Sequence, residues 1–143
     1  MGLDAAVFKS KKHLPFDPEA LGASFDPDTG EYFFEDDAME EKYPPEVWVA
    51  VAKWLGNITS IGHLREELAE VLEDDSVVMS KVIYSGTHTG DFLPMNALPD
   101  LEWELSVIDE YLEERSSPLV AQFVGDMREL MSAAQLEGNP IVF

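Results

Sequence analysis

The sequence predicts an α+β protein with a small mixed or antiparallel sheet and four main helices packed mostly on one of its faces. Two observations support this prediction. Short apolar segments of strand length occur at both ends and in the middle of the chain, and helical patterns fall in pairs between them. Paired helices between strands differ from the strict alternation of a parallel α/β sheet. The 143 residues suffice for one core, so we expect a single globular domain over residues 1–143.

The first third of the chain predicts a strand followed by a hairpin. Leu3–Phe8 is a compact apolar segment of strand length. The sequence DPDTG at Asp26–Gly30 combines an early proline with a glycine that can adopt positive φ, and aromatic residues lie on both sides of it. Asp26 and Asp28 also resemble the start of a calcium loop, but glycine comes one position too early for an EF-hand. A plain hairpin turn is therefore the better interpretation.

The next segment predicts two helices joined by a short turn at Gly56-Asn57. Prolines 44 and 45 suit a first helical turn, and apolar residues then recur at helical spacing. These residues are Val47, Trp48, Val51, Trp54 and Leu55. A second helix is expected to begin at Thr59 or Ser60, whose hydroxyls can cap it, and to bury Ile61, Leu64 and Leu68.

The second half predicts a central strand, two more helices and a terminal strand. Val77–Tyr84 is rich in β-branched residues, which favours a strand. Pro99 is expected to open one long helix, and Ser117-Pro118 the next. Gly138 should end that helix, because glycine readily takes the left-handed conformation, and Pro140–Phe143 should return as a strand.

The charge balance restricts the partners that this protein can bind. Twenty-nine acids against nine Lys and Arg residues give a formal charge of −20. This charge opposes binding to nucleic acid and to anionic membrane, and it attracts a cationic protein. Acidity that serves only solubility is the alternative. The candidate partner-binding residues are Glu35, Asp36, Asp37, Glu66, Glu67, Glu70, Glu110, Glu113 and Glu114.

The loop SGTHTGD holds the remaining residues that could form a site. Its candidate ligand-binding residues are Ser85, Thr87, His88, Thr89 and Asp91. Ser, His and Asp are the residue types of a hydrolase triad, but three residues within one short loop rarely converge in line, and the glycine spacing of a nucleophile elbow is missing. Gly86 and Gly90 would suit a phosphate cradle, although Walker spacing is absent. We favour a structural loop that presents His88 to a partner.

Other cofactor and location signals are few. The sequence has no cysteine, and its three histidines are scattered without metal-ligand spacing, so we expect no metal site and no cofactor. No apolar run has the length of a membrane span, and the first residues lack the order of a signal peptide. We therefore expect a cytoplasmic location.

Three segments of the chain resemble an uncharacterised bacterial family. The sequence opens with MGLD, carries YSGTHTGD and closes with EGNPIVF, as that family does. More distantly, the apolar opening strand, the Gly/Asp-bearing loop before an acidic helix, and the ending Gly138–Phe143 resemble immunity proteins of bacterial polymorphic toxin systems. The resemblance implies a protein that binds and neutralises a cognate toxin.

These observations leave three functions open. The first is an acidic cytoplasmic binding protein, in its most specific form an immunity-like inhibitor of a basic toxin. The second is a small enzyme or ligand-binding domain with its site at Ser85–Asp91. The third is a structural subunit that forms a homodimer through an apolar patch around Trp48 or Trp103.

Overall fold

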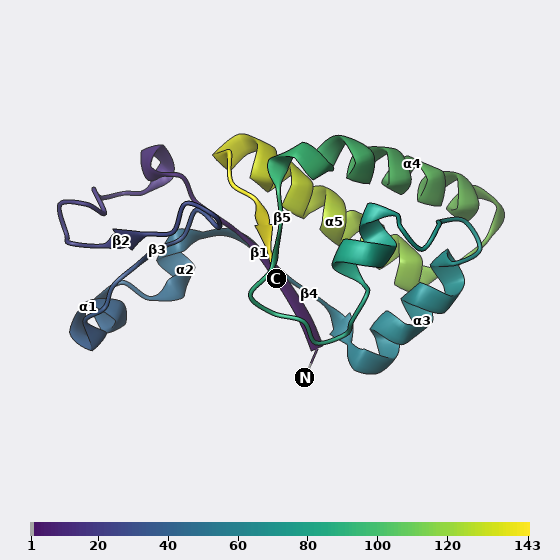
Figure 1. Ribbon diagram of the computed structural model, residues 1–143, viewed down its shortest axis with the longest axis horizontal. Coiled ribbons are helices and arrows are strands. Elements are labelled where there is room, and N and C mark those ends of the chain that lie inside the picture. The colour runs from purple at the N-terminus through teal and green to yellow at the C-terminus, as the bar shows by residue number, and fades with distance from the viewer. Residues whose placement is uncertain (1) are drawn as a thin grey trace.

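The computed structural model describes residues 2–143 and has an α+β fold (Figure 1). A four-stranded sheet has the strand order β4-β1-β6-β5, and each neighbouring pair is antiparallel. Its strands are β1 (Gly2–Phe8), β4 (Val49–Asn57), β5 (Phe92–Leu93) and β6 (Ile141–Val142). A separate hairpin pairs β2 (Ser24–Phe25) with β3 (Tyr32–Phe33), as the DPDTG turn predicts. The α+β prediction is therefore confirmed, with an antiparallel sheet.

The alternation of β1 explains why the helices cover one face of the sheet. Leu3, Ala5 and Val7 are buried, whereas Asp4 and Ala6 point to the opposite face and are less buried. The buried side chains join one core with the three long helices: α3 (Ile58–Leu68), α4 (Leu98–Glu114) and α5 (Pro118–Glu137). Helix α5 packs directly on β1 and β4, and α4 packs against α5. Within the described part of the chain, no helix is long and apolar enough to cross a bilayer.

Local capping fixes the ends of these helices. Asn57 caps α3 by accepting the Ser60 N–H at 2.8 Å, so this helix begins before the predicted Thr59 or Ser60 cap. Ser117 caps α5 as predicted, with Pro118 in its first turn. Gly138 ends α5 with φ of +66°, where a side chain would be strained.

The helix predicted over residues 45–55 is wrong. Only Pro45–Trp48 forms a helical turn, α2, and the chain then continues as β4 beside β1. Val49 and Val51 fit a strand as well as a helix, because a short apolar run supports both periodicities. Long-range pairing with β1 decides between them. Trp54, predicted to be buried, is 60% exposed on the face of the sheet opposite the helices.

The strand predicted over Val77–Tyr84 is also wrong, because this segment contains a short π-helix, η2 (Val78–Val82). Glu104 of α4 is buried, and its carboxylate accepts the N–H groups of Val77 and Val78 at 2.9 and 2.8 Å. These two bonds satisfy backbone donors at the start of η2 that a helix end otherwise leaves unpaired. Val78, Val82 and Ile83 are fully buried, so the apolar run forms core without pairing in a sheet.

Residues 9–48 form a second, smaller core that we call the aromatic lobe. It contains β2, β3, α1 (Asp37–Lys42), α2 and a short 3-10 turn, η1 (Lys11–His13), and lies at one end of the molecule (Figure 1). Tyr32, Phe34 and Trp48 are its buried centre. The Asn139 amide lies where β1 enters the lobe: it donates to the Phe8 carbonyl at 2.8 Å, and a Cβ on Gly30 of the lobe would collide with it. Gly30 is thus required by close approach as well as by its φ of +78°.

Candidate functional site

His88 of the SGTHTGD loop is held on both sides of its ring. Its Nδ1 lies 2.8 Å from Asp91 Oδ1, and its Nε2 donates to the Val82 carbonyl at 2.6 Å. The ring stacks on Tyr84, with centroids 4.2 Å apart, and the His88 side chain is only 7% exposed. Contrary to our prediction, the loop does not present His88 to a partner.

The rest of the loop supports this ring. The Tyr84 hydroxyl donates to Asp91 Oδ2, and backbone bonds join Gly90 and Asp91 to Phe143 at 2.9 Å. Burial raises the pKa of Asp91, but the hydrogen bonds from Tyr84 and His88 outweigh burial and hold that pKa below its ordinary value. The Ser85 hydroxyl accepts the Thr87 N–H at 3.3 Å, and neither histidine nitrogen contacts it. The Ser85–His88–Asp91 set therefore lacks the geometry of a triad.

The local structure requires glycine at both glycine positions of the loop. A Cβ at Gly86 would lie 2.9 Å from the backbone of Ile58, at the start of α3. Gly90 has φ of +84°, a conformation that favours glycine. Thr87 and Thr89 are exposed at the surface of the loop. These placements support the structural interpretation of SGTHTGD over a phosphate cradle.

The predicted acidic residues separate into two groups at opposite ends of the molecule (Figure 1). Glu35, Asp36 and Asp37 lie at the start of α1 in the aromatic lobe, where Asp36 caps the helix by accepting the Ala38 N–H. The second group, which we call the acidic end, combines acids from the end of α3 and the residues just after it with acids from the last turns of α4. Its members are Glu66, Glu67, Glu70, Glu110, Glu113 and Glu114.

Hydrogen bonds between the helices order the acidic end. The carboxylate of Glu67 accepts the hydroxyls of Tyr111 and Ser117, each at 3.0 Å. Burial and the bond to Glu67 raise the pKa of the Tyr111 hydroxyl. Arg115 pairs with Glu70 at 3.2 Å. The bonds fix part of the surface, while Glu66, Glu110, Glu113 and Glu114 remain exposed.

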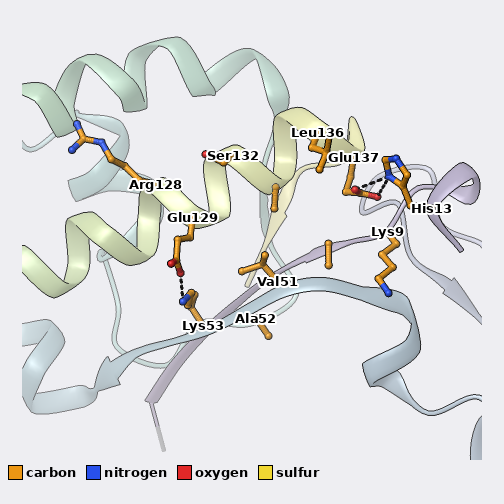
Figure 2. A pocket seen from close by; sticks show the side chains of 12 residues that line it. Lys9, His13, Val51, Ala52, Lys53, Arg128, Glu129, Ser132, Leu136 and Glu137 are labelled. Atoms are coloured by element: carbon orange, nitrogen blue, oxygen red, sulfur yellow. Dashed lines mark hydrogen bonds and ion pairs between the residues drawn. The ribbon is translucent and has the colours of Figure 1, made fainter.

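A groove that the sequence did not indicate lies between β4 and α5 (Figure 2). It has a volume of about 810 Å³, and its floor includes alanines 50 and 52, Val51 and Ala133. Strand β4 has only β1 as a strand neighbour within residues 2–143, so the groove runs along an edge of the sheet. Its charged and polar lining residues are Lys9, His13, Lys53, Arg128, Glu129, Ser132 and Glu137.

Most charges of this groove are already paired. Lys53 reaches across from β4 to Glu129 of α5 (Figure 2), and the hydrogen bond to Glu129 raises the pKa of its ammonium. Lys53 also lies 3.8 Å from Asp126 of the same helix. Arg128 pairs with Asp109 of α4 at 2.6 Å. Charged side chains along an edge strand also oppose pairing with another chain. The groove therefore resembles a protected sheet edge more than a charged ligand site.

Ser10, His13 and Glu137 form a polar cluster at one end of the groove. His13 Nδ1 lies 2.7 Å from both oxygens of Glu137, and the Ser10 N–H donates to Oε1 at 2.8 Å. Burial by itself raises the pKa of Glu137. The hydrogen bonds from His13 and Ser10 together have the larger effect and hold that pKa below its ordinary value. The Ser10 hydroxyl lies 3.3 Å from the same Nδ1, not from Nε2. Serine and acid thus share one nitrogen, which differs from a catalytic triad.

Sequence reasoning could not find this cluster, because His13 and Glu137 are 124 positions apart and have no local motif. Its components join the aromatic lobe to the end of α5, which is a structural role. Among residues 2–143, no group of three or more His, Asp or Glu side chains could hold a metal ion. Every buried side-chain N or O atom in the same range has a hydrogen-bond partner.

Comparison with known proteins found no relatives. No protein-family model matches the chain, and neither a curated protein nor a solved structure matches it. The resemblance to immunity proteins therefore stays a prediction.

Proposed function

We propose that this protein binds a cationic protein through its acidic end, and that in its most specific form it is an immunity-like inhibitor of a basic toxin. The observation that supports the proposal is that Glu66 and Glu67 of α3, and Glu70 just after it, gather beside Glu110, Glu113 and Glu114 of α4. The bonds of Tyr111 and Ser117 to Glu67 connect these two groups of acids.

Such a surface acts mainly on the rate of association and on specificity. Complementary potentials steer a basic partner toward the acidic end before contact, and like charges reject acidic competitors. The net charge of the whole molecule is −20, so the charges outside the acidic end also attract a cationic partner over a long range. The interaction should therefore weaken as salt screens it, over a Debye length of about 8 Å at physiological ionic strength.

Affinity capture from a lysate of the source cell, followed by kinetics on the captured partner, tests this proposal. We expect a basic protein that binds at low salt and is released at high salt. The triple variant E110Q/E113Q/E114Q should then lower its association rate about tenfold or more. The control E46Q/D75N/E102Q removes the same charge from exposed positions outside the acidic end. Equal effects of the two variants would contradict the proposal.

A homodimer is a second candidate, favoured by two exposed tryptophans. Trp103 on α4 is 67% exposed, and Trp54 lies opposite Asp4, on the sheet face away from the three long helices. The alternative patch around Trp48 is wrong, because Trp48 is buried in the aromatic lobe. Sedimentation of the purified protein over a range of concentrations tests this candidate, and a monomer at all concentrations would contradict it. The predicted cytoplasmic location is tested by cell fractionation.

A further inference from the structure

A second groove, which we call the aromatic groove, opens in the aromatic lobe. It has a volume of about 460 Å³ and combines rings from β3, α2 and the segments beside them with the face of α1. A volume of this size lies within the range of about 300–1,000 Å³ that ligand pockets occupy. Its lining residues are Phe8, Glu31, Tyr32, Phe33, Phe34, Asp37, Glu40, Glu41, Tyr43, Pro45 and Trp48.

The aromatic wall is ordered by contacts within the lobe. The Trp48 ring packs against Phe34, with centroids 5.6 Å apart, and against Tyr32 at 6.1 Å. The Trp48 Nε1–H donates to the Tyr43 carbonyl at 3.0 Å, which fixes the indole relative to the Tyr43 backbone. Phe33, by contrast, is 38% exposed. The groove thus has a preformed aromatic base and accessible apolar surface above it.

The charges of the groove have a single sign. Asp37, Glu40 and Glu41 follow one another at helical spacing along α1, so they share one side of that helix. Glu31 adds a fourth carboxylate. Its partial burial and, to a smaller extent, the charge of the neighbouring Asp26 raise its pKa. In the part of the chain that the structure describes, none of the lining residues is Lys, Arg or His. This distinguishes the aromatic groove from the β4–α5 groove, whose acids are paired with bases.

Aromatic rings and unpaired carboxylates together recognise cations. A ring face attracts a cation through its quadrupole, and the attraction is stronger where water is excluded. A guanidinium also stacks on rings through its flat surface and donates to carboxylates in a fork, which an ammonium cannot do. One face of Tyr43 already attracts a cation through its quadrupole, because the Lys42 ammonium lies 5.6 Å from its ring centroid.

We propose that the aromatic groove binds an arginine side chain of a polypeptide. The guanidinium would lie against the rings of the groove, and the carboxylates of α1 would accept its N–H groups. This site is at the other end of the molecule from the acidic end, and the proposal does not depend on the function proposed for that end. The alternative is that the groove is a gap left by the packing of the lobe, with carboxylates that serve solubility alone.

Titration of the full chain with N-acetyl-arginine amide and with N-acetyl-citrulline amide tests the proposal. Citrulline has nearly the shape of arginine but carries no charge, so it is the matched control. The NMR signals of the Trp48 indole N–H and of the Phe33 and Tyr43 rings should shift and saturate with arginine, and citrulline should bind about tenfold or more weakly. Equal responses to the two compounds, no response, or shifts confined to other residues would overturn the proposal.

Two variants locate the binding. E40Q/E41Q removes two exposed carboxylates of the groove and should weaken arginine binding about fivefold or more, a factor equivalent to about 1 kcal/mol. E35Q/E46Q removes the same charge from exposed positions of the same lobe outside the groove, and should change binding less than twofold. Similar losses in both variants would show attraction by general charge and would overturn the site. Failure of the acidic-end variant E110Q/E113Q/E114Q to affect a protein partner would leave this result unchanged.

Discussion

Two regions of the molecule use a histidine paired with a carboxylate, and they use it in opposite ways. In the SGTHTGD loop the histidine is the buried member, since the His88 side chain is 7% exposed and Asp91 is 40% exposed. At the junction between the aromatic lobe and α5 the carboxylate is buried, since Glu137 is 4% exposed and His13 is 37% exposed. The same pair of residue types therefore solves two different problems.

The partners of each buried group show what it does. Both nitrogens of His88 are engaged, one by Asp91 and the other by the Val82 carbonyl, so the ring connects the loop to the end of η2. Glu137 accepts bonds from His13 and from the backbone of Ser10, so it connects α5 to the start of the lobe. A His–acid pair is thus insufficient to indicate catalysis. Two features decide whether such a pair has a structural role: how many histidine nitrogens have partners, and which of the two residues is buried.

Removal of the buried member of the loop pair should have the largest effect. We expect H88L to lower the free energy of unfolding by about 2–4 kcal/mol, because leucine leaves the Val82 carbonyl without its donor and changes the packing against Tyr84 and Phe143. Denaturant unfolding followed by circular dichroism measures it. A loss below about 1 kcal/mol would show that the buried ring is not a structural element, and would return the loop to the candidate sites.

At the junction between the aromatic lobe and α5, the carboxylate should contribute more to stability than the histidine does. E137A should cost about 2 kcal/mol, because the Ser10 N–H loses its acceptor and a buried carboxylate side chain is replaced by a smaller one. H13A should cost less than about 1 kcal/mol, because His13 is partly exposed and the Ser10 bonds to Glu137 remain. The same unfolding measurement compares the two variants. If H13A is the more damaging, the comparison between the two pairs is wrong.

The carboxylates of both His–acid pairs should contribute to the loss of stability at low pH. The folded pKa values of Asp91 and Glu137 are lowered, so near pH 4 the unfolded chain binds more protons than the folded chain. Their contribution is complete above the ordinary carboxyl pKa of about 4 and is lost as pH falls through the lowered folded values. D91N and E137Q should each flatten part of this decline. Unfolding midpoints measured from pH 6 to pH 2 test it, and slopes equal to that of the parent protein would contradict it.

The sequence predicts elements well where the signal is local. The caps and stops of α5 lie in Ser117-Pro118 and Gly138, and the turn of the hairpin lies in Asp26–Gly30, so a short window contains the physical cause. Strand β4 and η2 show the limit. Val49–Asn57 becomes a strand because β1 pairs with it, and the run beginning at Val77 becomes helical where the carboxylate of Glu104, from α4, accepts its N–H groups.

The candidate sites divide in the same way. The acidic residues of α3 and α4 could be named from charge alone, but their meeting at one end depends on how the helices pack. The aromatic groove combines Phe8 of β1 with α1 and Trp48 from about thirty to forty residues further along the chain, and Trp48 lies in a segment whose helix was predicted incorrectly. No spacing rule joins such residues. Their common feature, rings beside carboxylates, appears only after the lobe has folded.

The smallest effect should come from the exposed hydroxyls of the loop. T87A and T89A remove side chains that lie at the surface, and S85A removes an acceptor for one loop N–H at 3.3 Å. Each should change the free energy of unfolding by no more than about 0.5 kcal/mol, as surface substitutions usually do. Unfolding of the triple variant S85A/T87A/T89A, with H88L as the positive control, measures the difference. A large loss in the triple variant would mean that the hydroxyls, rather than the His88–Asp91 pair, hold the loop. A small loss would show that the polar residues of SGTHTGD contribute unequally to stability. The buried His88 ring would stabilise the fold, and the hydroxyls could be replaced.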